Sequence, residues 1–336
     1  MTEIAGDLAA RAARFTADLA RVLPEGLAPG TPLALAVSGG PDSMALLWLA
    51  AASLPGRVAA ATVDHGLRSE AADEARLVAA ACAGLGVPHA TLRPAEPITG
   101  GNLHAAARAV RYALLGRWTE TVGARSLATA HQLDDQAETF LMRAVRGSGP
   151  AGLAGVRPRR DAGALTIIRP LLGWRRDELA AVVAAAGLPF ASDPSNEDER
   201  FERARVRRLL AEQPWLDPTG LAHAARHVGQ AERALAATVD WLWRTRRIAP
   251  AGVADPGLHV WLDLTDLPRE LRRRLAREAI RAVRLMNGMM PDFGLATNVE
   301  PLLDALEAGR SATQADILVT PSGGIWRFTR APPRRS

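Results

Sequence analysis

The chain has 336 residues, 48% of them hydrophobic, which is long enough for two or three domains with ordinary apolar cores. Its single cysteine, Cys82, excludes an intramolecular disulfide and any zinc or iron–sulfur site built from several cysteines of this chain. All 41 basic residues are arginines, so a Walker A lysine and a Schiff-base lysine are also excluded. The net charge of +5 is compatible with a polyanionic partner, although arginine bias can also reflect genome composition.

The opening segment MTEIAGDLAA carries acids early, and no apolar run reaches the roughly 20 residues that cross a bilayer. We therefore expect a cytoplasmic protein with no membrane partner. The composition changes near residue 217, which predicts a catalytic domain over residues 1–216 and a mainly helical domain over residues 217–336. The sequence leaves the formation of a homo-oligomer open.

Strand and helix signals alternate along the first domain. The predicted strands cover residues 33–37, 57–63, 88–93 and 126–129. The predicted helices cover residues 5–22, 44–49, 70–85, a segment that begins after Asn102, 175–186, and a basic stretch within 193–208. This alternation is typical of an α/β fold with a parallel sheet.

The segment SGGPDS at residues 38–43 lies between the first strand and an apolar helix. Gly39 and Gly40 leave room for a phosphate to approach the backbone, while Ser38 and Ser43 add hydroxyl donors. The turn's N–H groups and the helix dipole face the same point. The sequence therefore predicts a phosphate site here.

Polar side chains follow the second strand. Asp64 and His65 come directly after it, and ligands of open parallel sheets collect at the carboxyl ends of strands. We predict that Asp64 binds a ribose or an adenine edge, the alternative being a simple loop cap. Arg108 and Arg111 are three residues apart on one helix face, which is either a solvated stripe or a phosphate contact.

The fourth strand leads into the block AHQLDDQAET at residues 130–139. Adjacent carboxylates opposite a phosphate loop suit a magnesium–nucleotide site, because hard oxygen ligands bridge the metal to the phosphates. Asp135 and Glu138, at positions i and i+3, are predicted to point to one side. Acids also favour helix N-termini for dipole reasons, so this block is weak alone and gains from the other strand-end clusters.

Arginines are dense within residues 143–176 and in the basic helix within 193–208. Such a run is often only a solvated face. The backbone of RNA or the phosphates of ATP would be a suitable counter-charge for Arg200, Arg203 and Arg207, which are predicted to lie on one side of that helix. Glycines between residues 147 and 155 predict a mobile loop beside the site.

Long helices are predicted in the C-terminal part, over residues 219–246, 268–286 and 299–308. The middle one has leucines on one side and arginines on the other. We interpret it as an amphipathic helix that supports the domain, the alternative being a surface that faces RNA. Residues 317–320 and 324–329 predict strands joined as a hairpin by Pro321-Ser322-Gly323. Four tryptophans are interpreted as core or hinge packing residues rather than base-stacking platforms, namely Trp241, Trp243, Trp261 and Trp326.

The turn SGGPDS matches the SGGxDS signature of the PP-loop ATP pyrophosphatases, and the chain has no GxxxxGK[ST] sequence. Within that class, the chain resembles the tRNA(Ile)-lysidine synthase family. Gln132 stands where relatives often have a second histidine, and Ala204 where an asparagine is usual, which affects fine contacts rather than the class. The further matching blocks are VDHGLR at 63–68, ARAVRY at 107–112, AHQLDDQAET at 130–139, RGSG at 146–149 and DPSN at 193–196.

The resemblance implies a parallel sheet of the PP-loop, adenine nucleotide alpha hydrolase-like type, followed by a helical domain with a small terminal hairpin. It also implies a ligase that uses ATP and Mg²⁺ to join free L-lysine to C2 of the wobble cytidine in a tRNA(Ile) with a CAU anticodon. The cytidine C2 carbonyl oxygen would be adenylated with loss of pyrophosphate. Lysine would then displace AMP and leave lysidine.

Carried onto this chain, the resemblance makes Asp42 and Asp135 the expected Mg²⁺ ligands and catalytic residues. Glu138 is the candidate for binding lysine and removing its proton, and Arg111 and Arg205 are candidates for a phosphate or the lysine carboxylate. No protein nucleophile is needed, because positioning and charge neutralisation supply the rate. ATP binding is assigned to Ser38, Gly39, Gly40, Pro41, Asp42, Ser43, Asp64 and His65.

Other functions of the same fold fit less well. An RNA thiolase ordinarily needs catalytic cysteines or an iron–sulfur cluster, which Cys82 alone does not provide. A glutamine-fed ligase needs a glutaminase domain with its own nucleophile, and the sequence shows none. A non-catalytic nucleotide sensor is disfavoured by the acidic block opposite the turn.

Overall fold

The computed structural model describes residues 2–66, 71–98, 103–191, 200, 202–248, 258–290, 293–294 and 297–332. The chain divides into two compact units, Met1–Gly229 and Gln230–Ser336, each of which is considered by itself. Several residues named from the sequence lie outside the described part, including Leu67, Arg68, Asn102 and the DPSN block. None of the helices in the described part is long and apolar enough to cross a membrane.

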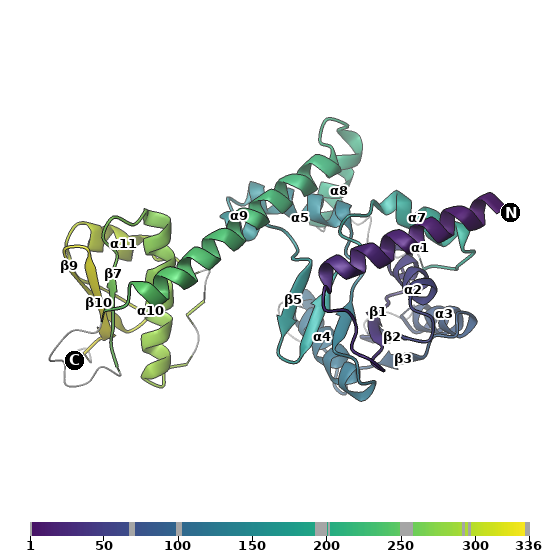
Figure 1. Cartoon of the computed structure of the whole chain (residues 1–336), viewed down its shortest axis with the longest axis horizontal. Coiled ribbons are helices and arrows are strands. Elements are labelled where there is room, and N and C mark those ends of the chain that lie inside the picture. Colours follow the sequence, from purple (N-terminus) through teal and green to yellow (C-terminus); the bar gives the residue numbers. More distant parts are fainter. Residues whose placement is uncertain are drawn as a thin grey trace. The chain divides into compact units, whose positions relative to one another are not determined.

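A six-stranded sheet forms the centre of the first unit (Figure 1). Its strands, in spatial order, are β3 (His89–Leu92), β2 (Val58–Val63), β1 (Leu33–Ala36), β4 (Ser126–Ala128), β6 (Leu165–Ile168) and β5 (Arg159–Ala162). Every pairing is parallel except that of β5 with β6. β2 and β3 follow on one side of β1, and β4 and β6 follow on the other side. The strand order therefore reverses between β1 and β4. Ligands of doubly wound folds bind at such a switch point, and both predicted strand-end motifs of the site follow these two strands.

The alternating sequence of β1 explains the layers on its two faces. Leu33 and Leu35 point into a core formed with α1 (Thr2–Val22), α2 (Pro41–Ser53), α3 (Ala71–Gly84) and α7 (Arg176–Ala185). Ala34 points the other way, where small side chains let α4 (Leu103–Thr121) pack closely through Leu115 and Trp118. The predicted α/β class and parallel PP-loop sheet are confirmed.

The remaining elements of the first unit are helical: α5 (Leu133–Val145), α6 (Pro150–Leu153), α8 (Glu202–Glu212) and α9 (Pro218–Thr245), which continues into the second unit. The predicted loop within residues 147–155 is partly wrong, because it contains α6. The hairpin β5–β6 was not predicted. Its strands are four residues long, and β5 is an edge strand with exposed charges, which hides the usual hydrophobic alternation.

The second unit is an antiparallel sheet packed on two helices. The helices are α10 (Arg269–Met286) and α11 (Glu300–Glu307), and the sheet order is β7 (Val260–Asp263), β10 (Ile325–Arg330), β9 (Ile317–Ser322) and β8 (Ala312–Gln314). The predicted hairpin is confirmed as β9–β10. However, Pro321 and Ser322 belong to the strand, and β7 and β8 enlarge the hairpin to a sheet.

The tryptophans of this unit differ in burial. Trp326 is 3% exposed in the core, as predicted, whereas Trp241 is 56% exposed and is not a core residue, which leaves the hinge packing that was its alternative. Trp241 and Leu242 are neighbours on α9, and Leu242 takes the buried position instead of Trp241. Sequence alone did not separate these two adjacent apolar residues.

Candidate active site

The turn after β1 is organised around the hydroxyl of Ser43. Its Oγ accepts hydrogen bonds from the backbone N–H groups of Ser38 at 3.2 Å and Gly39 at 3.1 Å, and donates to the carbonyl of Gly40 at 2.8 Å. Gly39 has a φ of +93°, a conformation that side chains with a Cβ rarely adopt. The turn is therefore fixed by its own residues before any ligand enters.

Helix α2 begins earlier than predicted. Pro41 occupies its first turn and Gly40 its N-cap, so Asp42 and Ser43 belong to the helix rather than to the turn. No side chain caps this N-terminus. Its N–H groups and the helix dipole are thus available to an anion, and the predicted phosphate site has suitable geometry.

Gln132 fixes the start of α5, at the carboxyl end of β4. Its Oε1 accepts hydrogen bonds from the backbone N–H groups of Asp134 and, at 3.4 Å, of Asp135. The carboxylate of Asp135 in turn accepts from the Gln132 N–H at 3.1 Å, which completes a capping box. The residue that departs from the family pattern is therefore a helix cap that orients Asp135.

Asp42 and Asp135 form a pair of neighbouring carboxylates. Burial, and next the charge of Asp135, raise the pKa of Asp42 to about 6. Burial and the charge of Glu138 also raise the pKa of Asp135. Oδ1 of Asp42 is buried without a hydrogen-bond partner among the described residues. A cation between the two carboxylates would relieve both effects.

This donor set fits Mg²⁺. The ion usually takes only one or two protein carboxylates and completes its shell with water and substrate phosphates. Across the part of the chain that the structure describes, no group of three or more metal-binding side chains occurs, so a dedicated protein cage is not the arrangement offered. Two carboxylates beside an open helix N-terminus are instead suited to a metal that arrives with a phosphate ligand.

Glu138 is the buried centre of an arginine cluster. Its side chain is 1% exposed and accepts hydrogen bonds from Arg176 and from Nε of Arg207, each at 2.9 Å, while Nε of Arg203 lies at 3.6 Å. These contacts bring α5, α7 and α8 together. Arg205 also lies on α8, but it is exposed, and its guanidinium donates to the carbonyl of Arg200 at 3.4 Å.

Asp64 follows β2 and is 5% exposed. Its Oδ1 accepts the N–H of Gly66 and its Oδ2 accepts Nε of Arg93, both at 2.9 Å. The Gly66 bond is the main reason that the pKa of this carboxyl is lowered. These contacts support the loop-cap alternative, because both oxygens already have partners within the protein.

His65 lies beside α4, against Arg111. Loss of hydration, followed by the nearby charge of Arg111, lowers the pKa of this imidazole. Nε of Arg111 lies 3.5 Å from His65 Nε2, which acts as the acceptor. Nδ1 of His65 is buried without a partner among the described residues, which leaves a donor available to a ligand.

A second group of arginines surrounds Tyr112 on α4. The guanidinium of Arg108 lies 5.1 Å and that of Arg160 5.5 Å from the centre of the Tyr112 ring. Arg169, only 4% exposed, follows β6 and donates to the carbonyl of Arg157 at 2.6 Å. We call Arg108, Tyr112, Arg160 and Arg169 the Tyr112 cluster.

His131 lies beside this cluster, at the end of β4. One ring nitrogen, Nδ1, is 2.9 Å from the hydroxyl of Thr129. Burial is the main reason that the pKa of His131 falls to about 3, with further contributions from Arg169, Arg108, Arg203 and Arg111. The sequence analysis gave His131, Arg160 and Arg169 no role. The missing signal was the hairpin β5–β6, which carries both arginines to the sheet's binding edge.

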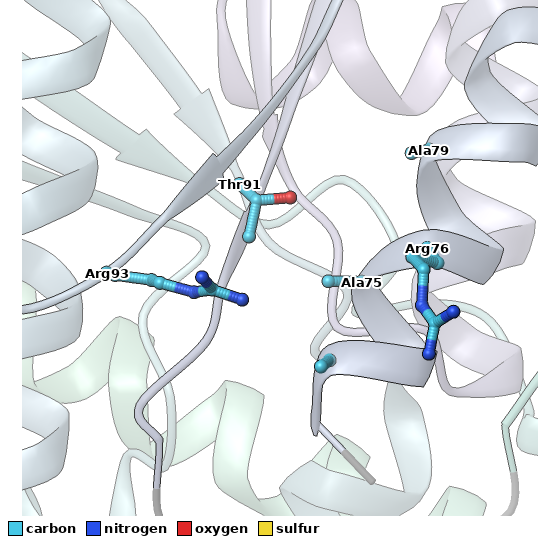
Figure 2. Close-up of a pocket in the computed structure, with 6 residues that line it drawn as sticks. Ala75, Arg76, Ala79, Thr91 and Arg93 are labelled. Carbon is cyan, nitrogen blue, oxygen red and sulfur yellow. The ribbon is translucent and has the colours of Figure 1, made fainter. Parts of the chain in front are cut away.

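A hollow of about 240 Å³ between α3 and β3 is a different feature (Figure 2). Arg93 reaches from β3 toward α3 across it, and Arg76 lies on the helix side. Arg93 is paired with Asp64 and Arg76 with Asp73. Both arginines that line the hollow thus already have a carboxylate partner, so we assign no ligand to it.

Comparison with known proteins agrees with this geometry. The family described as PP-loop domain matches residues 10–213. A tRNA(Ile)-lysidine synthase from Zymomonas mobilis subsp. mobilis is 44% identical over 90% of this chain and 89% of its own length. One from Novosphingobium aromaticivorans is 41% identical over 100% of this chain and 98% of its own length. The chain belongs to the tRNA(Ile)-lysidine synthase family.

The first unit also resembles solved structures of the wider fold. The U34-tRNA thiolase NcsA from Methanococcus maripaludis, solved with its [4Fe-4S] cluster, is 18% identical, with a TM-score of 0.50, over 65% of this chain and 78% of that one. This likeness concerns the fold alone. The only cysteine here, Cys82, is buried, and burial raises the pKa of its thiol to about 11, so it does not supply thiolase chemistry.

Proposed function

We propose that the chain catalyses ATP-dependent lysidine formation on tRNA(Ile) with a CAU anticodon, with free L-lysine as the second substrate. The observation that carries this proposal is the open N-terminus of α2 beside the Asp42–Asp135 pair. Membership of the family supplies the identity of the tRNA. The use of ATP and tRNA supports a cytoplasmic location.

The first step is adenylation of the target cytidine. Its C2 carbonyl oxygen attacks the α-phosphorus of ATP, the bond to the β-phosphate oxygen breaks, and pyrophosphate leaves. The Ser38–Ser43 turn and the α2 dipole would hold the phosphates in line for this attack. When bound by Asp42 and Asp135, Mg²⁺ would neutralise charge on those phosphates.

The second step requires lysine with a neutral amine. Its Nε attacks C2, the bond from C2 to the AMP oxygen breaks, AMP leaves, and the amine loses a proton. That proton would pass to water or to the phosphate of the leaving AMP, because a carboxylate that binds Mg²⁺, as Asp135 would, is a poor base. The three guanidinium contacts of Glu138 favour a positioning role over the lysine-binding role inferred from sequence. Arg111 and Arg205 stay candidates for an anionic group of either substrate.

We further propose that residues 1–216 carry out the chemistry and that residues 217–336 support or contact the tRNA. The arginines of α10 contribute little to RNA contact in this view, because carboxylates of the same unit pair with most of them. The exposed Trp241 on α9 offers a more suitable contact.

A direct test is to incubate the protein with Mg-ATP, labelled lysine and an unmodified CAU-anticodon tRNA, and to measure lysine in the RNA. Label should enter this tRNA and not a transcript whose wobble cytidine is replaced by uridine. Equal labelling of both transcripts would overturn the proposed target. Omission of ATP is the matched blank.

The metal assignment is tested with Asp42→Asn, and with Asp177→Asn as a control that removes an exposed carboxylate of the same unit. We expect Asp42→Asn to lower tRNA- and lysine-dependent ATP–pyrophosphate exchange by about 100-fold or more. Its unfolding free energy should not fall, because burial disfavours the charged form of Asp42. Full exchange activity in Asp42→Asn would show that the metal assignment is wrong.

A further inference from the structure

The Tyr112 cluster combines positive charge with little counter-charge. In the described part of the chain, no carboxylate forms an ion pair with Arg108, Arg160 or Arg169. This contrasts with Arg159, the neighbour of Arg160 on β5, whose guanidinium lies 2.6 Å from Glu25. Unpaired cations gathered around one tyrosine are unfavourable unless an anion joins them.

Arg169 is the least expected member of the cluster. It is 4% exposed, and its Nε has no hydrogen-bond partner among the described residues. Burial lowers the pKa of this guanidinium, and nearby Arg160 and Arg108 act in the same direction. A buried cation with an unused donor is retained at a cost in folding free energy, which points to a ligand.

The cluster lies on the face of the sheet that α4 covers. Arg160 is opposite Ile167 in the β5–β6 pairing, and Ile167 shares a face with Leu165, which packs with α4. Helix α2, with the phosphate turn at its start, packs on the other face. β6 and β5 are also the second and third strands away from β1. The cluster and the helix that starts at the phosphate turn thus lie on opposite faces of the sheet, which favours a second anion over the triphosphate.

We propose that Arg108, Arg160 and Arg169 bind an internucleotide phosphate of the RNA strand beside the target nucleotide. A phosphodiester suits this group because guanidinium forks match phosphate oxygens, and the Tyr112 ring orients two of the forks. The buried Arg169 supplies the fixed charge, while the exposed Arg108 and Arg160 close on the strand. The proposal rests on the proposed function, since it takes single-stranded RNA as the substrate.

The test compares Arg160→Gln and Arg108→Gln with Arg159→Gln, which removes the same charge from the same strand but on the other face. Binding of a CAU anticodon stem–loop is measured as a function of salt. We expect Arg160→Gln and Arg108→Gln to weaken binding about threefold to tenfold and to reduce the log–log salt slope by at most about 0.7 in either variant, the contribution of one phosphate. Arg159→Gln should match the parent chain, and ATP affinity should be unchanged in all three.

Stem–loops carrying one uncharged methylphosphonate then locate the phosphate. Neutralisation at the bound position should make the parent chain and Arg160→Gln equal, while neutralisation elsewhere should preserve their difference. Unchanged stem–loop affinity in both cluster variants would overturn the proposal, as would a loss confined to ATP or lysine affinity. Failure of the proposed function would appear separately, as absence of lysine transfer by the parent chain while the stem–loop still distinguishes the variants.

Discussion

Two regions of this chain concentrate arginine, and they differ in what each guanidinium faces. On α10, Arg273 bonds Glu300, and Arg274 makes a two-pronged contact with Glu232 at 2.8 and 2.7 Å. The pKa of each guanidinium is raised by these hydrogen bonds. These arginines complete their interactions within their own unit, as expected of a support helix.

Arginines of the Tyr112 cluster have the opposite setting. Arg169 is more deeply buried than Arg274, yet its main protein acceptor is a backbone carbonyl, and its pKa is lowered. The same residue type therefore marks structure where carboxylates surround it and a binding surface where they do not. The presence of several arginines in the sequence does not make this distinction, because it is common to both regions.

The largest expected effect concerns the paired region. Arg274 and Glu232 are 16% and 12% exposed, so Arg274→Gln leaves the largely buried carboxylate of Glu232 without its ion-pair partner. We expect the unfolding free energy of the second unit to fall by about 3 kcal/mol in urea titrations. Arg281→Gln is the control, since that arginine is 59% exposed and 3.9 Å from Glu278, and it should cost less than about 0.5 kcal/mol.

Adding Glu232→Gln to Arg274→Gln should recover part of the lost stability, because it removes the unpaired charge. If Arg274→Gln costs no more than Arg281→Gln, the α10 arginines are solvated and the contrast between the two regions fails. If the double variant loses as much stability as Arg274→Gln and Glu232→Gln lose together when measured singly, the two side chains do not interact and the contrast also fails.

A smaller effect of opposite sign is expected in the Tyr112 cluster. Arg169→Met removes a buried, unpaired cation and keeps an apolar stem of similar length, so unfolding free energy should rise by about 1 kcal/mol. Affinity for the anticodon stem–loop should fall in the same variant. Destabilisation by more than about 2 kcal/mol would instead make Arg169 a structural residue that holds the Arg157 carbonyl.

The half of the site around the Ser38–Ser43 turn was predictable from sequence because its signals are local. An apolar strand, a glycine turn and a helix determine the position of Ser43 within ten residues, and β4 with its capped helix does the same for Asp135. The error at Pro41 is also local, since proline starts a helix one turn earlier than the apolar pattern indicates.

The Tyr112 cluster was not predictable in the same way. Tyr112 and Arg169 are far apart in sequence and meet only because β6 pairs with β4 and β5 folds back on β6. The hairpin strands β5 and β6 are only four residues long, and the edge strand β5 carries exposed charges, so the hydrophobic pattern does not reveal them. The role of Arg274 likewise depends on its carboxylate partner Glu232, which lies on another helix. Their distance depends on how α9 and α10 pack, which the sequence does not give.

The smallest effect is a pH dependence at His131, beside the unpaired arginines. Its pKa of about 3 lies below the value of about 6.5 for an unfolded histidine. Between these limits the unfolded chain binds a proton that the native chain does not, so stability increases with pH and is lost as pH falls through this window.

In His131→Gln, the slope of unfolding free energy against pH should be smaller by up to about 1.4 kcal/mol per pH unit. Above about pH 7 the two curves should run parallel, which serves as the internal control. Parallel curves throughout the acidic window would mean that folding does not lower the pKa of His131. A bound stem–loop should diminish the difference in part, because its phosphate would offset the arginine charges that add to the effect of burial on the pKa of His131.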